Sequence, residues 1–262
     1  MGFVKNMIFD THAHYDDPQF DADRHEILGK MAQAGIGRIV DISADVPSWE
    51  KVLELTRQYP FVYGALGVHP SDVDGLNEET FSWLKAHIHD EKIVAVGEIG
   101  LDYYWEKDPV RKKNQKYWFR RQFELAKQEK MPVVIHSREA AQDTWELLRE
   151  MHAEEIPVVI HCYSYSPEMA RQFLSLNCWF GIGGVLTYKN AKKLRETAAM
   201  LPAEKILLET DCPYLSPVPF RGKRNSSLNL PYVIRTLSEI RGVSEEEIIA
   251  QTEKNAEAFY GL

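Results

Sequence analysis

The 262-residue chain has few cysteines and no long apolar stretch. Its three cysteines, Cys162, Cys178 and Cys212, show no Cys-x-x-Cys spacing, which argues against a disulfide framework and a cysteine zinc cage. No window approaches the roughly eighteen apolar residues of a membrane span, and the apolar stretch near the amino terminus is too short for a signal peptide. We therefore predict a cytoplasmic protein without membrane association, whose cysteines are reduced and mostly buried.

The chain also lacks an excess of basic residues and a glycine-rich phosphate loop. Its 31 Lys and Arg stand against 39 Asp and Glu, a net charge of −8, which disfavours nonspecific adhesion to nucleic acid without excluding a local positive site. Neither GxGxxG nor GxxxxGK[ST] occurs, so the common nucleotide-binding loops are not predicted. The composition, with 44% hydrophobic residues, is enough for the core of an enzyme-sized protein.

Short runs rich in Ile, Val and Phe alternate with longer amphipathic segments along the whole sequence, and no Gly/Ser/Pro-rich linker divides it. The runs are nearly continuously apolar, as expected of parallel strands covered on both faces. We predict eight strands, over 7–14, 37–43, 61–68, 92–102, 132–137, 156–164, 178–184 and 205–213.

The segments between the strands are long enough for crossover helices. Examples are 22–35, 47–59, 79–90, 111–130 and 137–155. The alternation predicts an α/β fold, a single (β/α)8 TIM barrel formed by one domain, residues 1–262. An extra C-terminal helix over 244–261 is expected to pack on the outside of the barrel. The alternative is an open doubly wound sheet, which would need a glycine-rich loop to bind nucleotide.

Five of the eight predicted strands end in side chains that bind metals. In a barrel of this kind the chemistry lies at the carboxyl ends of the strands, so these ends are the informative positions. A core without a ligand would not finish five strands with the donor types that divalent metals prefer. The predicted ligands are His12, His14, Glu98, His136, His161 and Asp211.

Two histidines on alternate positions share one face of a strand, with Cα atoms roughly 6.5 to 7 Å apart, so His12 and His14 can bind one ion. Four imidazoles and two carboxylates in one place would cost several kcal/mol in desolvation per ionised group unless cations neutralise them. We predict two divalent cations. One is bound by His12, His14 and Asp211, the other by His136 and His161, and Glu98 bridges them.

The remaining histidines and cysteines carry weaker signals. His69 follows the third strand in a loop at the same end of the barrel, where it is either a substrate contact or a turn residue. Cys162 and Cys212 adjoin predicted ligands, and strand alternation should turn both away from the ligand face into small buried positions. The other four histidines lie in charged helical segments and should be solvated: His25, His87, His89 and His152.

The predicted ligands lie in motifs through which the sequence resembles the TatD family of metal-dependent deoxyribonucleases, within the amidohydrolase-like barrel hydrolases. The resemblance covers nearly the whole chain. Its motifs are DTHAH (10–14), GVHP (67–70), VGEIGLDYY (96–104), HSR (136–138), HCYS (161–164), ETDCPYL (209–215) and PFRGKRN (219–225).

The resemblance implies the same six metal ligands and the hydrolysis of DNA phosphodiester bonds with divalent cations, as a 3′-5′ exonuclease on single-stranded DNA or DNA ends. We expect this activity to need neither a membrane nor an obligate protein partner. Two departures affect substrate preference: Ser226 and Ser227 replace the family's Glu-Pro, and Tyr165 replaces a small Gly. Imidazole ligands favour Zn or Mn, whereas the family nucleases are regarded as Mg-supported, so Mg, Mn and Zn all remain candidates.

Two ions about 3.5 to 4 Å apart can share a water and lower its pKa to near 7, which supplies a bridging hydroxide as nucleophile. Asp211 is the predicted proton acceptor, and Glu98 the second catalytic carboxylate. Arg138 and the run Arg221, Lys223 and Arg224 can contact phosphates. The predicted substrate-binding residues are His69 of the GVHP motif, Arg138 of the HSR motif, and Arg224 and Asn225 of the PFRGKRN motif.

Two other functions fit the same residues. A binuclear amidohydrolase or lactonase would act on a small amide or ester; many such barrels bridge their metals with a carboxylated lysine, whereas here Glu98 takes that position. Because barrels host many reactions, the fold alone does not decide. A binding module without catalysis would be favoured by the loss of a ligand, and none of the six is missing.

Overall fold

The eight predicted strands are all present and pair in parallel, in chain order from β1 to β8. The computed structural model describes residues 6–262; residues 1–5, part of the segment behind the localisation prediction, lie outside the described residues. The strands are β1 (Ile8–Ala13), β2 (Ile36–Ile42), β3 (Val62–Leu66), β4 (Ile93–Asp102), β5 (Val133–Arg138), β6 (Val158–Ile160), β7 (Trp179–Ile182) and β8 (Ile206–Leu208).

The first and last strands meet and bring the sheet round into a barrel. Ala13 forms a parallel bridge with Cys212 just beyond β8, and the Thr11 hydroxyl donates to the Leu208 carbonyl at 2.9 Å. The predicted TIM barrel is therefore confirmed. β6 and β8 have only three residues each because the chain after them turns away into loops, and those loops carry two of the predicted ligands.

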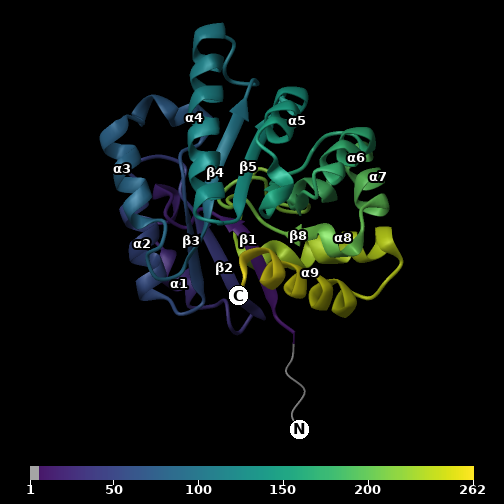
Figure 1. The fold of residues 1–262 in the computed structure, drawn as a ribbon. Helices are drawn as coiled ribbons and strands as arrows, with labels where there is room; N and C mark the ends of the chain where they lie inside the picture. The colour runs from purple at the N-terminus through teal and green to yellow at the C-terminus, as the bar shows by residue number, and fades with distance from the viewer. Residues whose placement is uncertain (1–5) are drawn as a thin grey trace.

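Helices between the strands form an outer layer around the sheet (Figure 1). None of the helices in residues 6–262 is long and apolar enough to cross a membrane. The helices are α1 (Arg24–Leu28), α2 (Trp49–Gln58), α3 (Glu78–His87), α4 (Pro109–Gln128), α5 (Ala141–Glu150), α6 (Pro167–Ser175), α7 (Lys192–Met200), α8 (Leu230–Arg241) and α9 (Glu245–Tyr260), and the 3-10 turns are η1 (Pro18–Phe20), η2 (Pro70–Gly75), η3 (Ala153–Glu155), η4 (Gly184–Thr187), η5 (Ala203–Lys205) and η6 (Ser227–Asn229).

The longest strand and the longest helix follow one another. β4 has 10 residues and α4 has 20, and α4 projects beyond the other elements at the end of the barrel to which β4 points (Figure 1). α4 begins where the sequence provides a cap: the Asp108 carboxylate accepts from the Val110 N–H, and Pro109 occupies the first turn, where a missing N–H costs nothing.

The predicted C-terminal helix is present. It was expected to pack only on the outside of the barrel, but its end also contacts the barrel interior. The capping box of Ser244 and Glu247 starts α9, and its last turn reaches the amino-terminal end of the barrel. There Phe259 and Tyr260 pack against the barrel interior, including Phe9 of β1 and Leu207 of β8. The helix closes the bottom of the barrel because its final apolar residues fill the space that the strand side chains leave open.

Candidate metal centre

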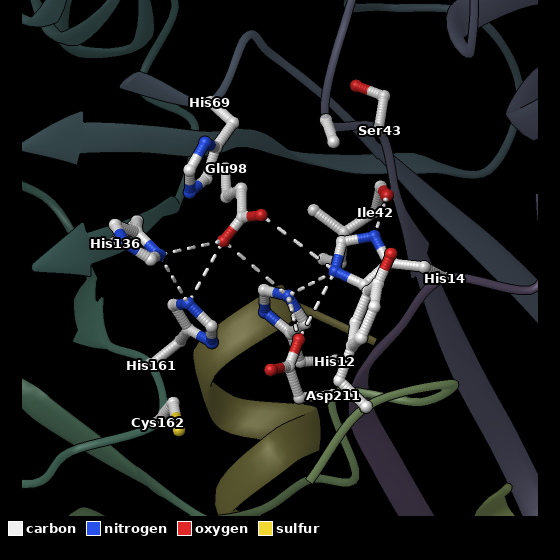
Figure 2. A network of polar contacts seen from close by, with 12 residues as sticks. His12, His14, Ile42, Ser43, His69, Glu98, His136, His161, Cys162 and Asp211 are labelled. Carbon is white, nitrogen blue, oxygen red and sulfur yellow. Dashed lines mark hydrogen bonds and ion pairs between the residues drawn. The ribbon is translucent and has the colours of Figure 1, made fainter. Parts of the chain in front are cut away.

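The carboxyl ends of the strands bring all six predicted ligands together. Figure 2 shows their side chains converging from separate strand ends, with the Glu98 carboxylate between the imidazoles. His12, His14, Glu98 and His161 are each at most 6% exposed, while the side chains of His136 and Asp211 are 16% exposed. The cluster therefore has a buried floor and one side that opens to solvent.

Bulges in two strands turn ligands inward. Phe9 of β1 and Ala95 of β4 face the barrel interior, so simple alternation would turn His12 and Glu98 away from it. Register shifts between Asp10 and Ala13 and between Val96 and Ile99 insert the extra residue that reverses the direction.

The ligand atoms fall into two groups. His12, His14 and Asp211 form one, and Glu98, His136 and His161 form the other, and within each group the atoms lie within 4.8 Å of one another. Oε2 of Glu98 is 2.9 Å from Nε2 of His161 and 3.6 Å from Nδ1 of His136, and its Oε1 is 3.8 Å from Nε2 of His14. The carboxylate thus lies between the groups.

Each imidazole turns one ring nitrogen toward these positions. Nδ1 of His14 is 2.6 Å from the Ile42 carbonyl, to which it donates, so Nε2 is the nitrogen that faces Glu98 and Asp211. That atom is 3.1 Å from Nε2 of His12. Oε2 of Glu98 is buried and has no hydrogen-bond partner among the described residues. Nitrogen and carboxylate donors at this spacing fit divalent cations.

The same packing shifts the pKa values of the ligands. Burial and the neighbouring His161 lower the pKa of His12 well below its usual value. Burial lowers the pKa of His14, but the carboxylates of Asp211 and Glu98 outweigh it and raise this pKa well above the usual value. Burial raises the pKa of Glu98, yet the facing His161 brings it well below the usual value, so the carboxylate is ionised.

Asp102, at the end of β4, holds His136 from behind. Its Oδ2 is 3.1 Å from Nε2 of His136, which leaves Nδ1 to face Glu98. Burial lowers the pKa of His136, but the neighbouring carboxylates of Asp102 and Glu98 raise it to about 9. The other oxygen of Asp102 accepts the backbone N–H groups of Tyr104 and Trp105 at 2.8 and 3.0 Å. A carboxylate behind a histidine fixes the ring orientation and strengthens its ligand nitrogen.

Glu209, just after β8, is the second acidic residue behind the ligands. It accepts the N–H of Cys162 at 2.5 Å and lies 3.8 Å from Nδ1 of His161. Burial raises its pKa to about 8. Gly181 of β7 provides the space, since a Cβ there would lie 2.0 Å from Oε2 of Glu209.

Asp102 and Glu209 were not among the predicted site residues. Both lie in motifs of the sequence, GLDYY and ETDCP, so an available signal was a carboxylate placed close to a predicted ligand.

A cavity of about 900 Å³ opens above the ligands; five of the six line it, and His12 is buried beneath them. His69, Arg138, Trp105 and Tyr214 lie on its wall. The side near β1, β2 and β3 is acidic, being lined by Asp16, Asp17, Asp45 and Asp72.

The predicted substrate contacts divide between this cavity and the scaffold. His69 faces His136 at 4.2 Å between ring centroids, and burial and the neighbouring His136 lower its pKa to about 3. The guanidinium of Arg138 lies 3.9 Å from the Tyr104 ring centroid. Arg224 pairs instead with Asp23. Asn225 is buried and donates to the Thr210 carbonyl at 3.0 Å.

Cys162 lies on the cavity wall, contrary to prediction, because β6 ends at Ile160 and a positive φ of 44° at Cys162 breaks the alternation. Cys178 and Cys212 are buried, as predicted.

Two of the residues that depart from the family pattern form hydrogen bonds within the protein. The Ser227 hydroxyl donates to Asp10 at 2.6 Å, and the hydroxyls of Tyr165 and Ser137 are 3.0 Å apart.

Known proteins resemble this chain over nearly its whole length. The family model described as TatD related DNase matches residues 9–261. The uncharacterized metal-dependent hydrolase YabD of Bacillus subtilis (strain 168) is 40% identical over 256 residues, which cover 98% of this chain and 100% of that protein. The uncharacterized metal-dependent hydrolase TatD of Mycobacterium tuberculosis is 33% identical over 97% of both chains. The crystal structure of YJJV, a TATD homolog from Escherichia coli K12, superposes with a TM-score of 0.91 at 32% identity, covering 97% of this chain and 98% of that one.

Proposed function

Since the chain belongs to the TatD family and is a metal-dependent hydrolase, we propose that it hydrolyses phosphodiester bonds in DNA, as a 3′-5′ exonuclease on single strands or DNA ends. One observation carries the proposal. The ligand atoms form two groups on either side of Glu98 at the floor of an open cavity, a geometry that suits two divalent cations acting on one phosphoryl group.

The residues that would hold the cations are His12, His14 and Asp211 on one side and His136 and His161 on the other, with Glu98 between them. When bound, such ions supply Lewis-acid activation of water and neutralise charge on a phosphate. Their charge also offsets the acidic wall of the cavity, which would otherwise repel a polyanion.

The chain's own groups then have distinct roles. Asp211 is the most exposed of the ligand carboxylates and reaches the cavity, so it accepts the proton of the attacking water. Nδ1 of His69 accepts the Ser71 N–H at 3.1 Å, which leaves Nε2–H as a donor toward a phosphate oxygen. The lowered pKa of His69 keeps that ring neutral near pH 7. Arg138 supplies a planar cation at the rim.

The test is turnover of an end-labelled single-stranded oligonucleotide by the purified protein with Mg²⁺, Mn²⁺ or Zn²⁺, beside a duplex of the same sequence and a panel of amides and lactones. Stepwise loss of nucleotides from the 3′ end is expected, with elemental analysis identifying the copurified metal. Glu98→Gln and Asp211→Asn should lose this activity, and His152→Ala, an exposed surface control, should retain it. Turnover of the panel without cleavage of the oligonucleotide would overturn the proposal.

A further inference from the structure

Two large aromatic side chains lie exposed at the edge of the catalytic cavity, where burial would be expected of such residues. Trp105 is 70% exposed and Tyr104 is 41% exposed, both in the loop between β4 and α4. Trp105 also lines the cavity. Exposed aromatic side chains beside a functional cavity mark a surface that contacts a ligand.

The cation beside these rings is free to bind a phosphate. The Arg138 guanidinium lies 3.9 Å from the centroid of Tyr104 and 5.7 Å from that of Trp105. Among residues 6–262 no carboxylate forms an ion pair with it. The aromatic faces hold the guanidinium in place while its N–H groups remain available.

The loop is fixed before any ligand arrives. Asp102 accepts the N–H groups of Tyr104 and Trp105, and the Tyr104 and Trp105 rings meet edge to face at 4.7 Å with an angle of 85°. A preorganised surface loses less conformational entropy on binding.

Two lysines near the start of α4, one of them beside Tyr103 of the same loop, add further positive charge. Five other basic residues of α4 have acidic partners: Arg111, Lys116, Arg120, Arg121 and Lys127. Within the described residues Lys112 and Lys113 have none. Nζ of Lys112 lies 4.3 Å from the centroid of Tyr103, and Lys113 is exposed. Their charge is therefore available to a polyanion.

Charge differs across the mouth of the cavity. The far side carries the acidic residues Asp16, Asp17, Asp45 and Asp72, and its cation Lys51 is paired with Glu54, while Arg138 at the end of β5 lines the other side. The phosphates of a DNA strand would be attracted to the side with Arg138 and repelled from the side with the aspartates.

We propose that Tyr104, Trp105, Lys112, Lys113 and Arg138, here called the aromatic-basic rim, bind the part of a single-stranded DNA substrate that extends away from the cleaved bond. This inference rests on the proposed nuclease function. A base stacks on the free face of Trp105, Arg138 contacts the adjoining phosphate, and the lysines contact the next phosphates along α4. Single strands are required, because a base within a duplex has no free face to stack.

The first measurement is the fluorescence anisotropy of a labelled phosphorothioate single strand of about twelve nucleotides. The full-length protein is titrated with this strand and with an abasic strand of the same length. We expect Trp105→Ala to weaken binding of the base-bearing strand about 5- to 100-fold, since stacking of one base contributes that much. Binding of the abasic strand should change little, and Trp105→Tyr should restore most of the affinity.

The second measurement is the salt dependence of the same binding. Lys112→Gln/Lys113→Gln should weaken both strands alike and reduce the slope of log K against log salt by about one to two, because fewer counterions are released. The matched controls are Tyr117→Ala, an aromatic 51% exposed further along α4, and Lys254→Gln on α9. Both should bind as the wild type does, and all variants should keep the wild-type Tm.

The outcomes separate this inference from the proposed function. If the wild type neither binds nor cleaves the oligonucleotide, the nuclease proposal fails and the rim proposal fails with it. If the wild type binds and cleaves while Trp105→Ala or the double lysine variant binds unchanged, the rim alone is overturned. An equal loss of base-bearing and abasic strands in Trp105→Ala would also overturn the stacking role.

Discussion

Gly181 of β7 and Glu209 after β8 lie so close that the glycine leaves no room for a side chain: a Cβ there would lie 2.0 Å from Oε2 and 2.5 Å from Cδ of the glutamate. Both atoms belong to a fully buried side chain that also accepts the N–H of Cys162. The identity of residue 181 is thus tied to the position of the carboxyl group behind His161.

Gly181→Ala is expected to displace Glu209 and to lower the free energy of unfolding by about 1 to 3 kcal/mol, the usual cost of overpacking a core. Thermal and urea unfolding of the metal-free protein measure this. Gly75→Ala is the control, because the nearest atom to its Cβ would be 3.8 Å away. Equal stability of Gly181→Ala and the wild type would show that the carboxylate moves without cost.

Divalent cations are expected to stabilise the folded chain, since the ligand groups come together only when it folds. At a free concentration about 100 times Kd, the gain is about 2.7 kcal/mol. The Tm after EDTA treatment should therefore rise when Mn²⁺ or Zn²⁺ is added. Glu98→Gln should reduce this rise, and His25→Ala, an exposed histidine of α1, should not. A Tm that is independent of cation would contradict the assigned ligands.

Asp102→Asn is expected to lower cation affinity about 10- to 100-fold, because the carboxylate that orients His136 and strengthens its ligand nitrogen is lost. The amide oxygen still accepts the N–H groups of Tyr104 and Trp105, so the loop should remain folded. Isothermal titration calorimetry measures the affinity. Asp72→Asn, which lines the same cavity on its acidic side, is the control and should bind cations as the wild type does.

The strand ends explain how far the sequence predicts this site. Alternating apolar and amphipathic segments identify all eight strands, and barrel geometry brings their ends together, so residues as distant as His12 and Asp211 can be assigned to one centre. The two bulges that turn His12 and Glu98 inward have no signature in the pattern. Their ligand role was nevertheless predictable from their residue type and their place at a strand end.

Other features depend on packing that the pattern does not contain. The position of Cys162 depends on where β6 stops, which is at Ile160 and not at the end of the predicted strand over 156–164. The last turn of α9 reads as an ordinary amphipathic helix, and only the space inside the barrel determines that Phe259 enters it. Arg224 is one of several basic residues in its loop, and its partner Asp23 lies 201 positions away in the sequence.

Phe259→Ala is expected to lower the free energy of unfolding by about 3 to 5 kcal/mol, since it opens a cavity where α9 closes the barrel. The ligands lie at the opposite end of the strands, so activity per folded molecule should stay close to that of the wild type. Urea unfolding and the oligonucleotide assay measure the two quantities. The control is Leu262→Ala, since Leu262 is 41% exposed. A similarly small effect in both variants would show that the packing of Phe259 inside the barrel contributes little stability.

Cys178 is expected to resist alkylation in the folded protein. Burial raises the pKa of its thiol to about 12, so little thiolate exists at pH 8. The raised pKa stabilises the fold below pH 9, and this contribution is lost as the pH rises from 9 toward 12, at up to about 1.4 kcal/mol per pH unit. Iodoacetamide labelling read by mass spectrometry should modify Cys178 only in urea. Compared with the wild type, Cys178→Ala should lose less stability between pH 9 and 11.

The two oxygens of Asp102 face different tasks: one orients a ligand of the metal centre, and the other sets the backbone of the loop that carries Trp105. Any cation that draws His136 into a tighter position also acts, through this side chain, on the loop. If a single DNA strand binds this loop, thermodynamic reciprocity requires that the DNA change the affinity for cations by the same factor as cations change the affinity for DNA. Substrate and metal would then alter each other's binding affinity through one carboxyl group.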